Sequence, residues 1–390
     1  MLKERYLTDA VFEDLREKMV FVGGARQVGK TTFAVELLGK RFEKPAYFNW
    51  DNRSDRREIM ASRWPADSDL LIFDEIHKLR GWKNLIKGEY DKLKTRYKIL
   101  VTGSARLDIV RRGGDSLQGR YHYYRMHPFS MAEILGRKTS VEIFKEVAVA
   151  GDSGRAELEA LLEFGGFPEP LFKQNARHLR RWHNEKIERL FRDDIGTTAQ
   201  VRDLGLMKLL SDILPERVGS LFSVNSVRED LDAGYKAVSN WLAILESFYY
   251  AYRIRPFTSR WVRSLKKEPK LYLWDWSEIP DRGARFENLV ASHLLKLCHF
   301  LHDRDGFAAE LYFLRDVEKR EADFLVAVDR RPWFAVETKL ADEDVSPDLI
   351  YFKEKMKIPI AYQVIGKTGV HRFVRDVHVV SADLFLAGLV

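Results

Sequence analysis

The 390-residue sequence contains a single cysteine, Cys298, which excludes an internal disulfide framework and fits a reducing compartment. It contains no run of 18 apolar residues, and charged side chains follow the N-terminal methionine in place of an apolar signal core. Low-complexity tracts and internal repeats are absent as well, whereas hydrophobic residues make up 45% and aromatic residues 12%. We therefore expect a cytoplasmic chain of several globular domains, with no membrane span and no membrane partner.

The positive charge of the chain is unevenly distributed. The formal net charge is +7, and most of the excess lies in two segments, residues 173–192 and 253–270. Trp182, Phe257 and Trp261 stand between the cations of these segments, an arrangement typical of nucleic-acid-binding surfaces. We therefore expect DNA as a partner, with an ordinary solvated basic face as the alternative.

The most informative motif is a phosphate-binding loop. The apolar run 19–22 leads into Gly24-Ala25-Arg26-Gln27-Val28-Gly29-Lys30-Thr31, and a helical stretch begins at Thr32. A strand, a glycine-rich turn and a helix N-terminus gather backbone N–H groups around one point, where the helix dipole also favours negative charge. We expect Lys30 to reach the β- and γ-phosphates of ATP or GTP, and the Thr31 hydroxyl to bind Mg²⁺. The expected nucleotide-binding residues are Gly24, Gln27, Val28, Gly29, Lys30, Thr31 and Thr32.

Two further strand-like runs end in residues suited to nucleotide hydrolysis. Residues 70–73 are an unbroken apolar run that ends in Asp74 and Glu75, as expected of a buried parallel strand whose carboxyl end meets a ligand. Asp74 is predicted to hold Mg²⁺ through water, and Glu75 to orient the water that attacks the γ-phosphate. The run 98–102 leads to Ser104, which is predicted to sense the γ-phosphate. Capping of a following helix is the alternative for the two acids.

The segment after this third strand carries a family resemblance. Residues 107–117 favour a helix, and Gln118-Gly119-Arg120 then leads into an aromatic strand at 121–126. This arrangement resembles the AAA+ ATPases, in particular the branch with origin-recognition proteins and STAND-like switches. The resemblance implies that Arg120 is an arginine finger for a neighbouring subunit's γ-phosphate, and hence a homo-oligomer such as a hexamer. Arg111 and Arg112 compete for this role, and an ordinary cation at a helix end is the alternative.

The middle of the chain predicts two further pieces. Residues 138–200 are expected to form an all-helical lid, broken only at Gly165-Gly166-Phe167-Pro168. From residue 201 the pattern of three helices and two short strands is typical of a winged helix, with residues 258–269 as the wing. A module that only packs against protein is the alternative. The third helix would present three polar residues to a duplex, namely Lys236, Ser239 and Asn240.

The last third of the chain contains acids and a lysine in an order suited to phosphodiester hydrolysis. Glu337 and Lys339 point to the same face of a predicted strand at 334–339, and Asp323 begins the strand before it. Two carboxylates and an ammonium suit a Mg²⁺-dependent phosphodiesterase, in which Asp323 and Glu337 hold the metal and Lys339 acts on the attacking water.

This order resembles that of the PD-(D/E)xK restriction-like nucleases, although Glu321-Ala322 stands where the motif has its proline. The resemblance implies Glu287 as the helix acid and Gln363 as an accessory residue. We assign no chemistry to a second Glu-x-Lys sequence at 268–270. A cross-strand ion pair on a purely structural fold is the alternative for the first.

Over nearly its whole length the chain resembles a prokaryotic family that fuses an AAA+ ATPase to a winged helix and a restriction-like nuclease domain. The expected fold is α/β, with an AAA+ P-loop core at 1–137, a helical lid at 138–200, a winged helix at 201–278 and an α/β restriction-endonuclease-like domain at 279–390. We expect an ATPase that uses ATP and Mg²⁺, binds DNA and couples hydrolysis to DNA processing, with nuclease activity at the C-terminal site. The alternative is a nucleotide-gated switch that binds DNA or protein through an inert nuclease-like domain.

Overall fold

The computed structural model describes residues 3–104, 117, 119–149, 151, 153–196, 203–258 and 267–390. The chain divides into two compact units, which we call the N-terminal unit (residues 1–128 and 247–249) and the C-terminal unit (129–246 and 250–390). None of the helices in the described ranges is long and apolar enough to cross a membrane. The helix predicted at 107–117, which contains Arg111 and Arg112, lies outside the described residues except for its last position.

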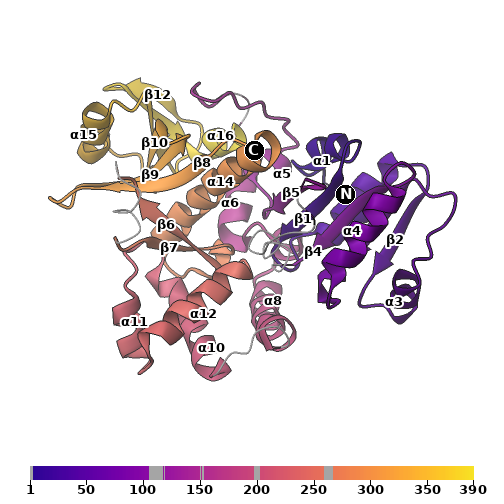
Figure 1. Cartoon of the computed structure of the whole chain (residues 1–390). Coiled ribbons are helices and arrows are strands. Elements are labelled where there is room, and N and C mark those ends of the chain that lie inside the picture. The colour runs from indigo at the N-terminus through magenta and orange to yellow at the C-terminus, as the bar shows by residue number, and fades with distance from the viewer. Residues whose placement is uncertain are drawn as a thin grey trace. The chain divides into compact units, whose positions relative to one another are not determined.

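The N-terminal unit is built on a five-stranded parallel sheet. Every residue of the central strands β1 and β3 is buried, as expected for the apolar runs of a parallel sheet that is covered on both faces. The predicted α/β arrangement with a parallel sheet is therefore confirmed for this unit. Across the sheet the strands are β2 (Pro45–Asn49), β3 (Leu70–Asp74), β4 (Lys98–Gly103), β1 (Met19–Gly24) and β5 (Tyr121–Met126) (Figure 1).

One face of this sheet is covered by α4 (Trp82–Leu93), whose Trp82 and Ile86 share a core with Phe21 and Phe73. This packing follows from the amphipathic pattern of α4, which places its apolar side chains on one stripe. The other helical elements of the unit are α1 (Thr8–Asp14), α2 (Lys30–Thr32), η1 (Phe33–Leu38), η2 (Gly39–Arg41), α3 (Arg53–Met60) and η3 (Ile76–Lys78).

The C-terminal unit contains a mixed eight-stranded sheet. The β6–β7 hairpin joins it through parallel pairing of β6 with β8, in which Arg255 faces Tyr312 and Pro256 faces Phe313. The two strands expected in the winged helix therefore belong to the same sheet as the strands expected in the nuclease-like domain. Across the sheet the order is β12 (His371–Val374), β13 (Val377–Ser381), β11 (Ile360–Ile365), β10 (Arg331–Lys339), β9 (Glu321–Val328), β8 (Ala309–Arg315), β6 (Ala251–Pro256) and β7 (Lys270–Leu273).

Helices pack against this sheet. Its core includes Leu349 and Phe352 of α15, which pack with Leu325 and Ala335 of neighbouring strands. The helical elements of the unit are α5 (Met131–Ile134), α6 (Arg155–Phe164), α7 (Pro168–Lys173), α8 (Ala176–Arg189), η5 (Leu190–Ile195), α10 (Leu204–Ile213), η6 (Leu214–Arg217), α11 (Val224–Asp230), α12 (Tyr235–Ser247), η7 (Trp276–Glu278), α14 (Arg282–Asp305), α15 (Pro347–Met356) and α16 (Ala382–Ala387).

The expectation that residues 138–200 are all helical is wrong for their first part. The described residues between 138 and 149 form no helix. Side chains of the sheet bind this backbone instead: Trp333 Nε1 donates to the Lys145 carbonyl at 2.9 Å, and Val147 N donates to Tyr362 Oη at 2.8 Å. Side chains of β10 and β11 thus satisfy backbone groups of this non-helical segment, which we call the strap.

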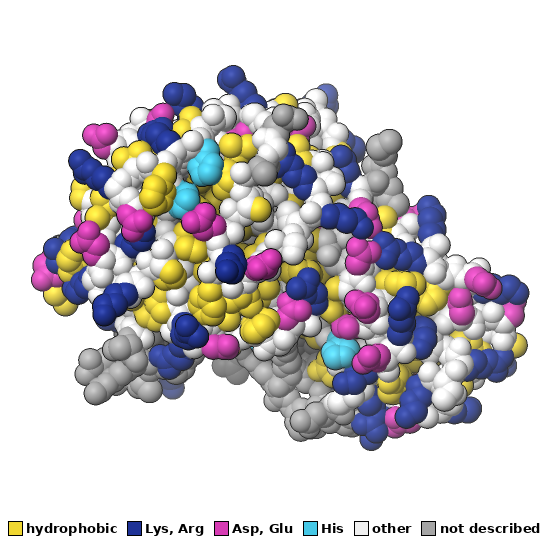
Figure 2. Space-filling model, turned by 90° about the horizontal axis from the view of Figure 1, so that it is seen from above, with side chains coloured by type: hydrophobic (Ala, Val, Ile, Leu, Met, Phe, Trp, Pro, Cys, Tyr) yellow, Lys and Arg dark blue, Asp and Glu magenta, His cyan; other side chains and the backbone are white. Residues whose placement is uncertain are grey.

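Charged side chains of both signs are mixed on the surface. On the face shown in Figure 2, lysines and arginines alternate with aspartates and glutamates. Elsewhere in the described chain, oppositely charged side chains form ion pairs, as Arg372 does with Asp342 at 2.5 Å and Arg217 with Asp230 at 2.8 Å. On this face the charges do not form a patch of one sign, so we look for a DNA surface in particular elements.

A buried histidine ties α14 to α5 inside the C-terminal unit. His293 is 2% exposed, its Nε2 accepts a hydrogen bond from Met131 N at 3.0 Å, and its Nδ1 donates to the Leu289 carbonyl at 2.8 Å. Both ring nitrogens are used in the neutral form, and a second proton would oppose the Met131 N–H. Burial lowers the pKa of His293 to about 4.

This histidine predicts a loss of stability in mild acid. The ordinary pKa of a histidine is 6.5, so between pH 6.5 and 4 the unfolded chain binds a proton that the folded chain does not. The free energy of unfolding should therefore fall by about 2 kcal/mol between pH 7 and pH 5 because of His293 alone. In urea unfolding at both pH values, His293→Gln should lack this contribution, whereas the exposed His371→Gln should keep it. Equal pH dependence of wild type and His293→Gln would contradict the assignment.

Candidate functional site

The phosphate-binding loop connects β1 to α2 in a tight turn. Gly29 has φ 100° and Gln27 has φ 63°, so the loop uses left-handed backbone at two positions. A Cβ on Gly24 would lie 2.5 Å from the Met126 carbonyl oxygen, which only glycine avoids. The chain therefore turns back on itself and starts α2 at Lys30, as the motif predicts.

Lys30 lies inside this loop. It is 6% exposed, and its Nζ donates to the carbonyl oxygens of Gly24 at 3.0 Å and Ala25 at 2.8 Å. Two carbonyl oxygens of the loop thus hold the ammonium group. Phosphate oxygens can replace these carbonyl oxygens as acceptors.

Asp74 is held by hydroxyl groups from three elements. Thr31 Oγ1 and Tyr47 Oη donate to its Oδ2 at 2.7 and 3.0 Å, and Thr102 Oγ1 donates to its Oδ1 at 2.6 Å. Asp74 is 2% exposed, so this carboxylate is fixed in one orientation. The two predicted Mg²⁺ ligands, the Thr31 hydroxyl and the Asp74 carboxylate, are therefore adjacent. Both offer oxygen atoms, which Mg²⁺ prefers.

Sequence reasoning missed Tyr47 and Thr102. Thr102 is the register partner of Asp74 on β4, so its hydroxyl could have been placed from strand order. Tyr47 lies on β2, two residues before the register partner of Asp74. Burial and the Asp74 charge raise the pKa of Tyr47 well above its usual value, so this hydroxyl stays a donor.

Glu75 and Ser104 lie at the same end of the sheet, with His77 between them. Glu75 has φ 56°, and its backbone N donates to the Thr102 carbonyl at 3.0 Å. Its Oε2 is 3.6 Å from His77 Nε2, which in turn is 3.4 Å from Ser104 Oγ. Lys78 Nζ is 3.3 Å from the same Glu75 oxygen. His77 carried no signal in the sequence, but it connects the two residues predicted to act on the γ-phosphate.

Arg120 is engaged within its own unit. Its Nε and Nη2 donate to the two carboxylate oxygens of Asp91 at 2.8 and 3.2 Å. Asp91 belongs to α4, so the pair joins α4 to the start of β5. A finger role would require Arg120 to leave Asp91, and it stays a prediction.

The predicted acids of the C-terminal unit converge. Thr338 N and Oγ1 donate to Asp323 Oδ2 at 2.8 and 2.6 Å, which places Asp323 beside β10 between Glu337 and Lys339. Lys339 Nζ is 3.2 Å from Glu337 Oε1. Glu337 is 7% exposed, and among the described residues its Oε2 has no hydrogen-bond partner.

Glu287 of α14 completes this group, which we call the acidic cluster (Glu287, Glu321, Asp323 and Glu337). Tyr272 Oη donates to Glu287 Oε1 at 2.7 Å. Burial and the charge of Asp323 raise the pKa of Glu287 to about 7 and that of Glu337 to about 8. Carboxylates so close together need cations, and an unpartnered buried carboxylate oxygen fits a hard divalent cation.

Lys270 is the residue of this cluster that sequence reasoning missed. It belongs to the Glu-x-Lys sequence at 268–270, to which we assign no chemistry from the sequence. Its Nζ is 2.6 Å from Glu321 Oε1, 3.4 Å from Glu287 Oε1 and 3.8 Å from Asp323 Oδ1. Only the pairing of the β6–β7 hairpin with β8 brings it there, and no local pattern announces that pairing.

Gln363, the predicted accessory residue, has its amide hydrogen-bonded to the loop before α15. Its Oε1 accepts from Ser346 N at 2.8 Å, and its Nε2 donates to the carbonyls of Glu343 and Asp344 at 3.2 Å each. The amide is therefore used to fix the loop before α15, although Gln363 is the register partner of Glu337.

The basic segment 173–192 is only partly available to DNA. Trp182 is 2% exposed and packs on Phe167 with ring centroids 5.2 Å apart, so it cannot stack on bases. Lys186 Nζ binds Asp275 Oδ2 at 2.6 Å and also Glu278, which fills the space between these acids and His183 and argues against a metal ion there. The exposed cations of α8 include Arg177, Arg180 and Arg181.

The predicted wing lies mostly outside the described residues. Residues 259–266, with Trp261 and Lys266, are not described, whereas Lys267 is exposed. Of the residues predicted to face a duplex, Lys236 and Asn240 are exposed and Ser239 is half-buried. Contact of this region with DNA stays a prediction.

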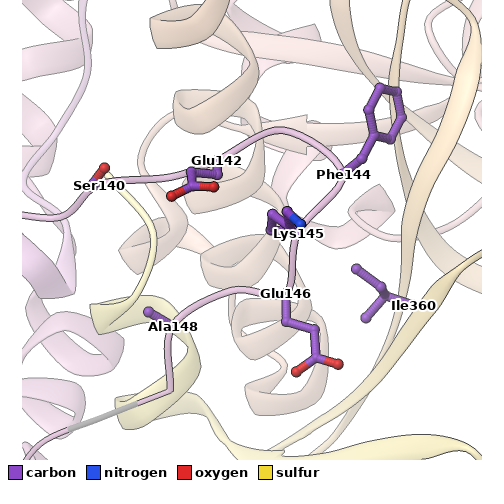
Figure 3. Close-up of a pocket in the computed structure, with 7 residues that line it drawn as sticks. All are labelled: Ser140, Glu142, Phe144, Lys145, Glu146, Ala148 and Ile360. Atoms are coloured by element: carbon purple, nitrogen blue, oxygen red, sulfur yellow. The ribbon is translucent and has the colours of Figure 1, made fainter.

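A pocket of about 630 Å³ lies between the strap and β11. Figure 3 shows that its lining comes from strap residues between Ser140 and Ala148 and from Ile360. Glu142, Lys145 and Glu146 give it charges of both signs. None of these residues belongs to the nucleotide site or to the acidic cluster.

Three stretches of the chain match known families. Residues 16–135 match the AAA domain family AAA_14, residues 155–277 match the domain of unknown function DUF8612, and residues 282–385 match the domain of unknown function DUF4143. The first match contains the phosphate-binding loop, Asp74, Glu75 and Ser104.

Two uncharacterized proteins are similar to most of this chain. The chain is 22% identical to the uncharacterized protein MJ1544 of Methanocaldococcus jannaschii over 87% of this chain and 79% of that protein. It is 20% identical to the uncharacterized protein Rv2008c of Mycobacterium tuberculosis over 92% of this chain and 78% of that protein.

Solved structures with some similarity include two nucleic-acid enzymes. The Thermotoga maritima RuvB Holliday junction branch migration motor is 16% identical with a TM-score of 0.29, covering 67% of this chain and 93% of that chain. The Pyrococcus furiosus Hef helicase domain is 10% identical with a TM-score of 0.21, covering 93% of this chain and 89% of that chain. The assignment of residues 16–135 therefore depends on the family match and on the site geometry: this stretch is a P-loop ATPase domain of the AAA type.

Proposed function

We propose that this protein binds DNA and couples ATP hydrolysis to DNA processing, with Mg²⁺-dependent cleavage of DNA at the acidic cluster. The observation that carries the proposal is the convergence of Glu287, Asp323 and Glu337 with two lysines in a chain that also has an ATPase domain. Carboxylates and a lysine in this arrangement suit phosphodiester hydrolysis.

At the nucleotide site, this chain's residues have separate roles. Lys30 exchanges the loop carbonyls for phosphate oxygens, and Glu75 accepts a hydrogen bond from the attacking water and so orients it. Asp74 and the Thr31 hydroxyl would hold Mg²⁺, which when bound offsets charge on the β- and γ-phosphates. Ser104 can bind the γ-phosphate, and His77 positions Glu75 relative to it.

At the acidic cluster, Asp323 and Glu337 would hold a divalent cation, which when bound polarises the phosphodiester and acidifies its water. Lys339 has a third of its side chain exposed and lies beside Glu337. It is therefore placed to orient the attacking water and to hold a proton. Tyr272 keeps Glu287 in position by donating to its Oε1.

A second candidate is the nucleotide-gated switch with an inert nuclease-like domain. Lys270 favours it, because a buried ammonium between Glu287, Glu321 and Asp323 is a cation already supplied by the chain. The test is incubation of pure protein with Mg²⁺ and labelled linear, single-stranded and branched DNA, with and without ATP. Cleavage supports the first candidate, whereas ATP-dependent binding without cleavage supports the switch.

The arginines of α8 make a prediction about DNA binding. Arg177, Arg180 and Arg181 are exposed at a spacing that places them on one side of the helix. Reversing all three to glutamate should weaken binding to every DNA sequence and flatten its salt dependence, by roughly 0.9 in log–log slope per lost phosphate contact. Binding measured by fluorescence anisotropy at several salt concentrations gives both quantities.

A matched control exists in α3, where Arg53, Arg56 and Arg57 have the same spacing and are also exposed. Their reversal changes the net charge equally. If both triple variants lose the same affinity and slope, the effect comes from net charge and α8 is not the DNA surface.

A further inference from the structure

Lys270 divides the acidic cluster into two halves. On one side, its Nζ lies within 3.8 Å of carboxylate oxygens of Glu287, Glu321 and Asp323. It is 2% exposed, so water contributes little to its solvation. Three carboxylates therefore surround a lysine ammonium group that has little water around it.

The other half lies between Asp323 and Glu337. Here Lys339 contacts only Oε1 of Glu337 within salt-bridge distance, at 3.2 Å, and a third of its side chain is exposed. The second oxygen, Oε2, is buried without a hydrogen-bond partner among the described residues. A buried carboxylate oxygen left this way is destabilising unless a ligand satisfies it.

The two halves differ in what they can still bind. A divalent cation beside Glu287 would meet the ammonium group of Lys270 and be repelled, because like charges a few ångströms apart in a buried site interact strongly. Beside Glu337 it would meet an unsatisfied oxygen and the negative charge of nearby Asp323. Glu321, the remaining acid, also binds Arg315 Nη1 at 2.5 Å and is fully occupied by cations of the chain.

We infer that the acidic cluster takes a single divalent cation, at Asp323 and Glu337, and that Lys270 supplies the second positive charge, on the Glu287 side, that another metal ion would otherwise supply. This deepens the proposed nuclease site and rests on it. Lys270 is a positioning residue, since it acts through the carboxylates that it holds. It comes from the β6–β7 hairpin, so the site is complete only when that hairpin is in the sheet.

Mn²⁺ binding counts the sites directly. The titration uses full-length Lys30→Ala protein without nucleotide, which leaves the phosphate-binding loop empty, and follows free Mn²⁺ by electron paramagnetic resonance. One Mn²⁺ per chain is expected. Asp323→Asn and Glu337→Gln should each weaken the affinity for this ion by at least tenfold. Lys270→Gln should bind two, and Lys270→Arg, which keeps the charge, should bind one.

Glu287→Gln separates the halves even if Lys270→Gln fails to fold. It should keep the single site with affinity within about threefold, because its carboxylate faces Lys270. Two Mn²⁺ in the parent, one in Lys270→Gln, or loss of binding in Glu287→Gln would each overturn the inference while leaving metal-dependent cleavage possible. Absence of Mn²⁺ binding would overturn both, whereas one site without DNA cleavage would overturn only the proposed function.

Discussion

Glu75→Gln protein should bind ATP as tightly as the wild type but hydrolyse it roughly 10²- to 10⁴-fold more slowly. Glutamine keeps the size of the side chain, but it cannot accept the proton of the attacking water as a carboxylate does. Lys30 and Thr31 bind the loop carbonyls and Asp74, and these residues should still hold the nucleotide. Phosphate release under saturating ATP measures turnover, and titration with a fluorescent ATP analogue measures binding.

Lys30→Ala is the comparison for this variant. Its ammonium group serves the phosphates of the bound nucleotide, so its loss should weaken binding itself and turnover with it. Turnover at the wild-type rate in Glu75→Gln would remove Glu75 from its assigned role. In that case His77, 3.6 Å away, would be the next residue to replace.

Asp323→Asn should abolish Mg²⁺- or Mn²⁺-dependent nicking of DNA while ATP hydrolysis stays within about twofold of wild type. Asparagine can still accept hydrogen bonds from Thr338, so the strand pair keeps its shape, but it is a weak ligand for a divalent cation. Lys339→Ala should reduce cleavage nearly as much, because the attacking water would no longer be oriented by the lysine. Cleavage of labelled linear and branched DNA on gels measures the effect.

Asp329→Asn provides a matched control. Asp329 is exposed in the turn between β9 and β10, on the same hairpin as Asp323 and Glu337. The Asp329→Asn protein should cut DNA at the wild-type rate. If wild-type protein binds DNA and hydrolyses ATP but cuts no DNA or RNA with either metal between about pH 6 and 9, the inert-switch alternative replaces the nuclease proposal.

The nucleotide site could be placed from sequence because its residues come in contiguous segments. Lys30 and Thr31 follow the loop directly, and Asp74 ends a buried strand whose parallel neighbours finish at the same edge. Tyr47 could not be found this way, because only the register of β2 against β3 brings its hydroxyl to Asp74. A side chain that contributes through cross-strand register leaves no local signal.

The C-terminal unit shows the same limit more strongly. Asp323, Glu337 and Lys339 could be brought together from their order on two neighbouring strands. Lys270 enters through a parallel pairing of strands more than 50 residues apart, β6 with β8, which no periodicity indicates. Trp182 was wrongly expected on a DNA-binding surface, because it lies between arginines in the sequence. In an amphipathic helix, buried aromatic residues and exposed arginines alternate along the chain although they lie on opposite faces.

The pairing of β6 with β8 has a consequence for how this gene can be cut and recombined. The second and third family matches end and begin at residues 277 and 282, yet the sheet runs across that seam. A fragment beginning at residue 279 would leave the β8 edge open at Tyr312 and Phe313, a template for pairing with other chains, and would also lose Lys270. Expression of the third stretch alone should therefore give aggregated protein. For the same reason, a chimera of two relatives should take the second and third stretches from one parent. A junction between residues 277 and 282 would pair strands and charged residues from different proteins.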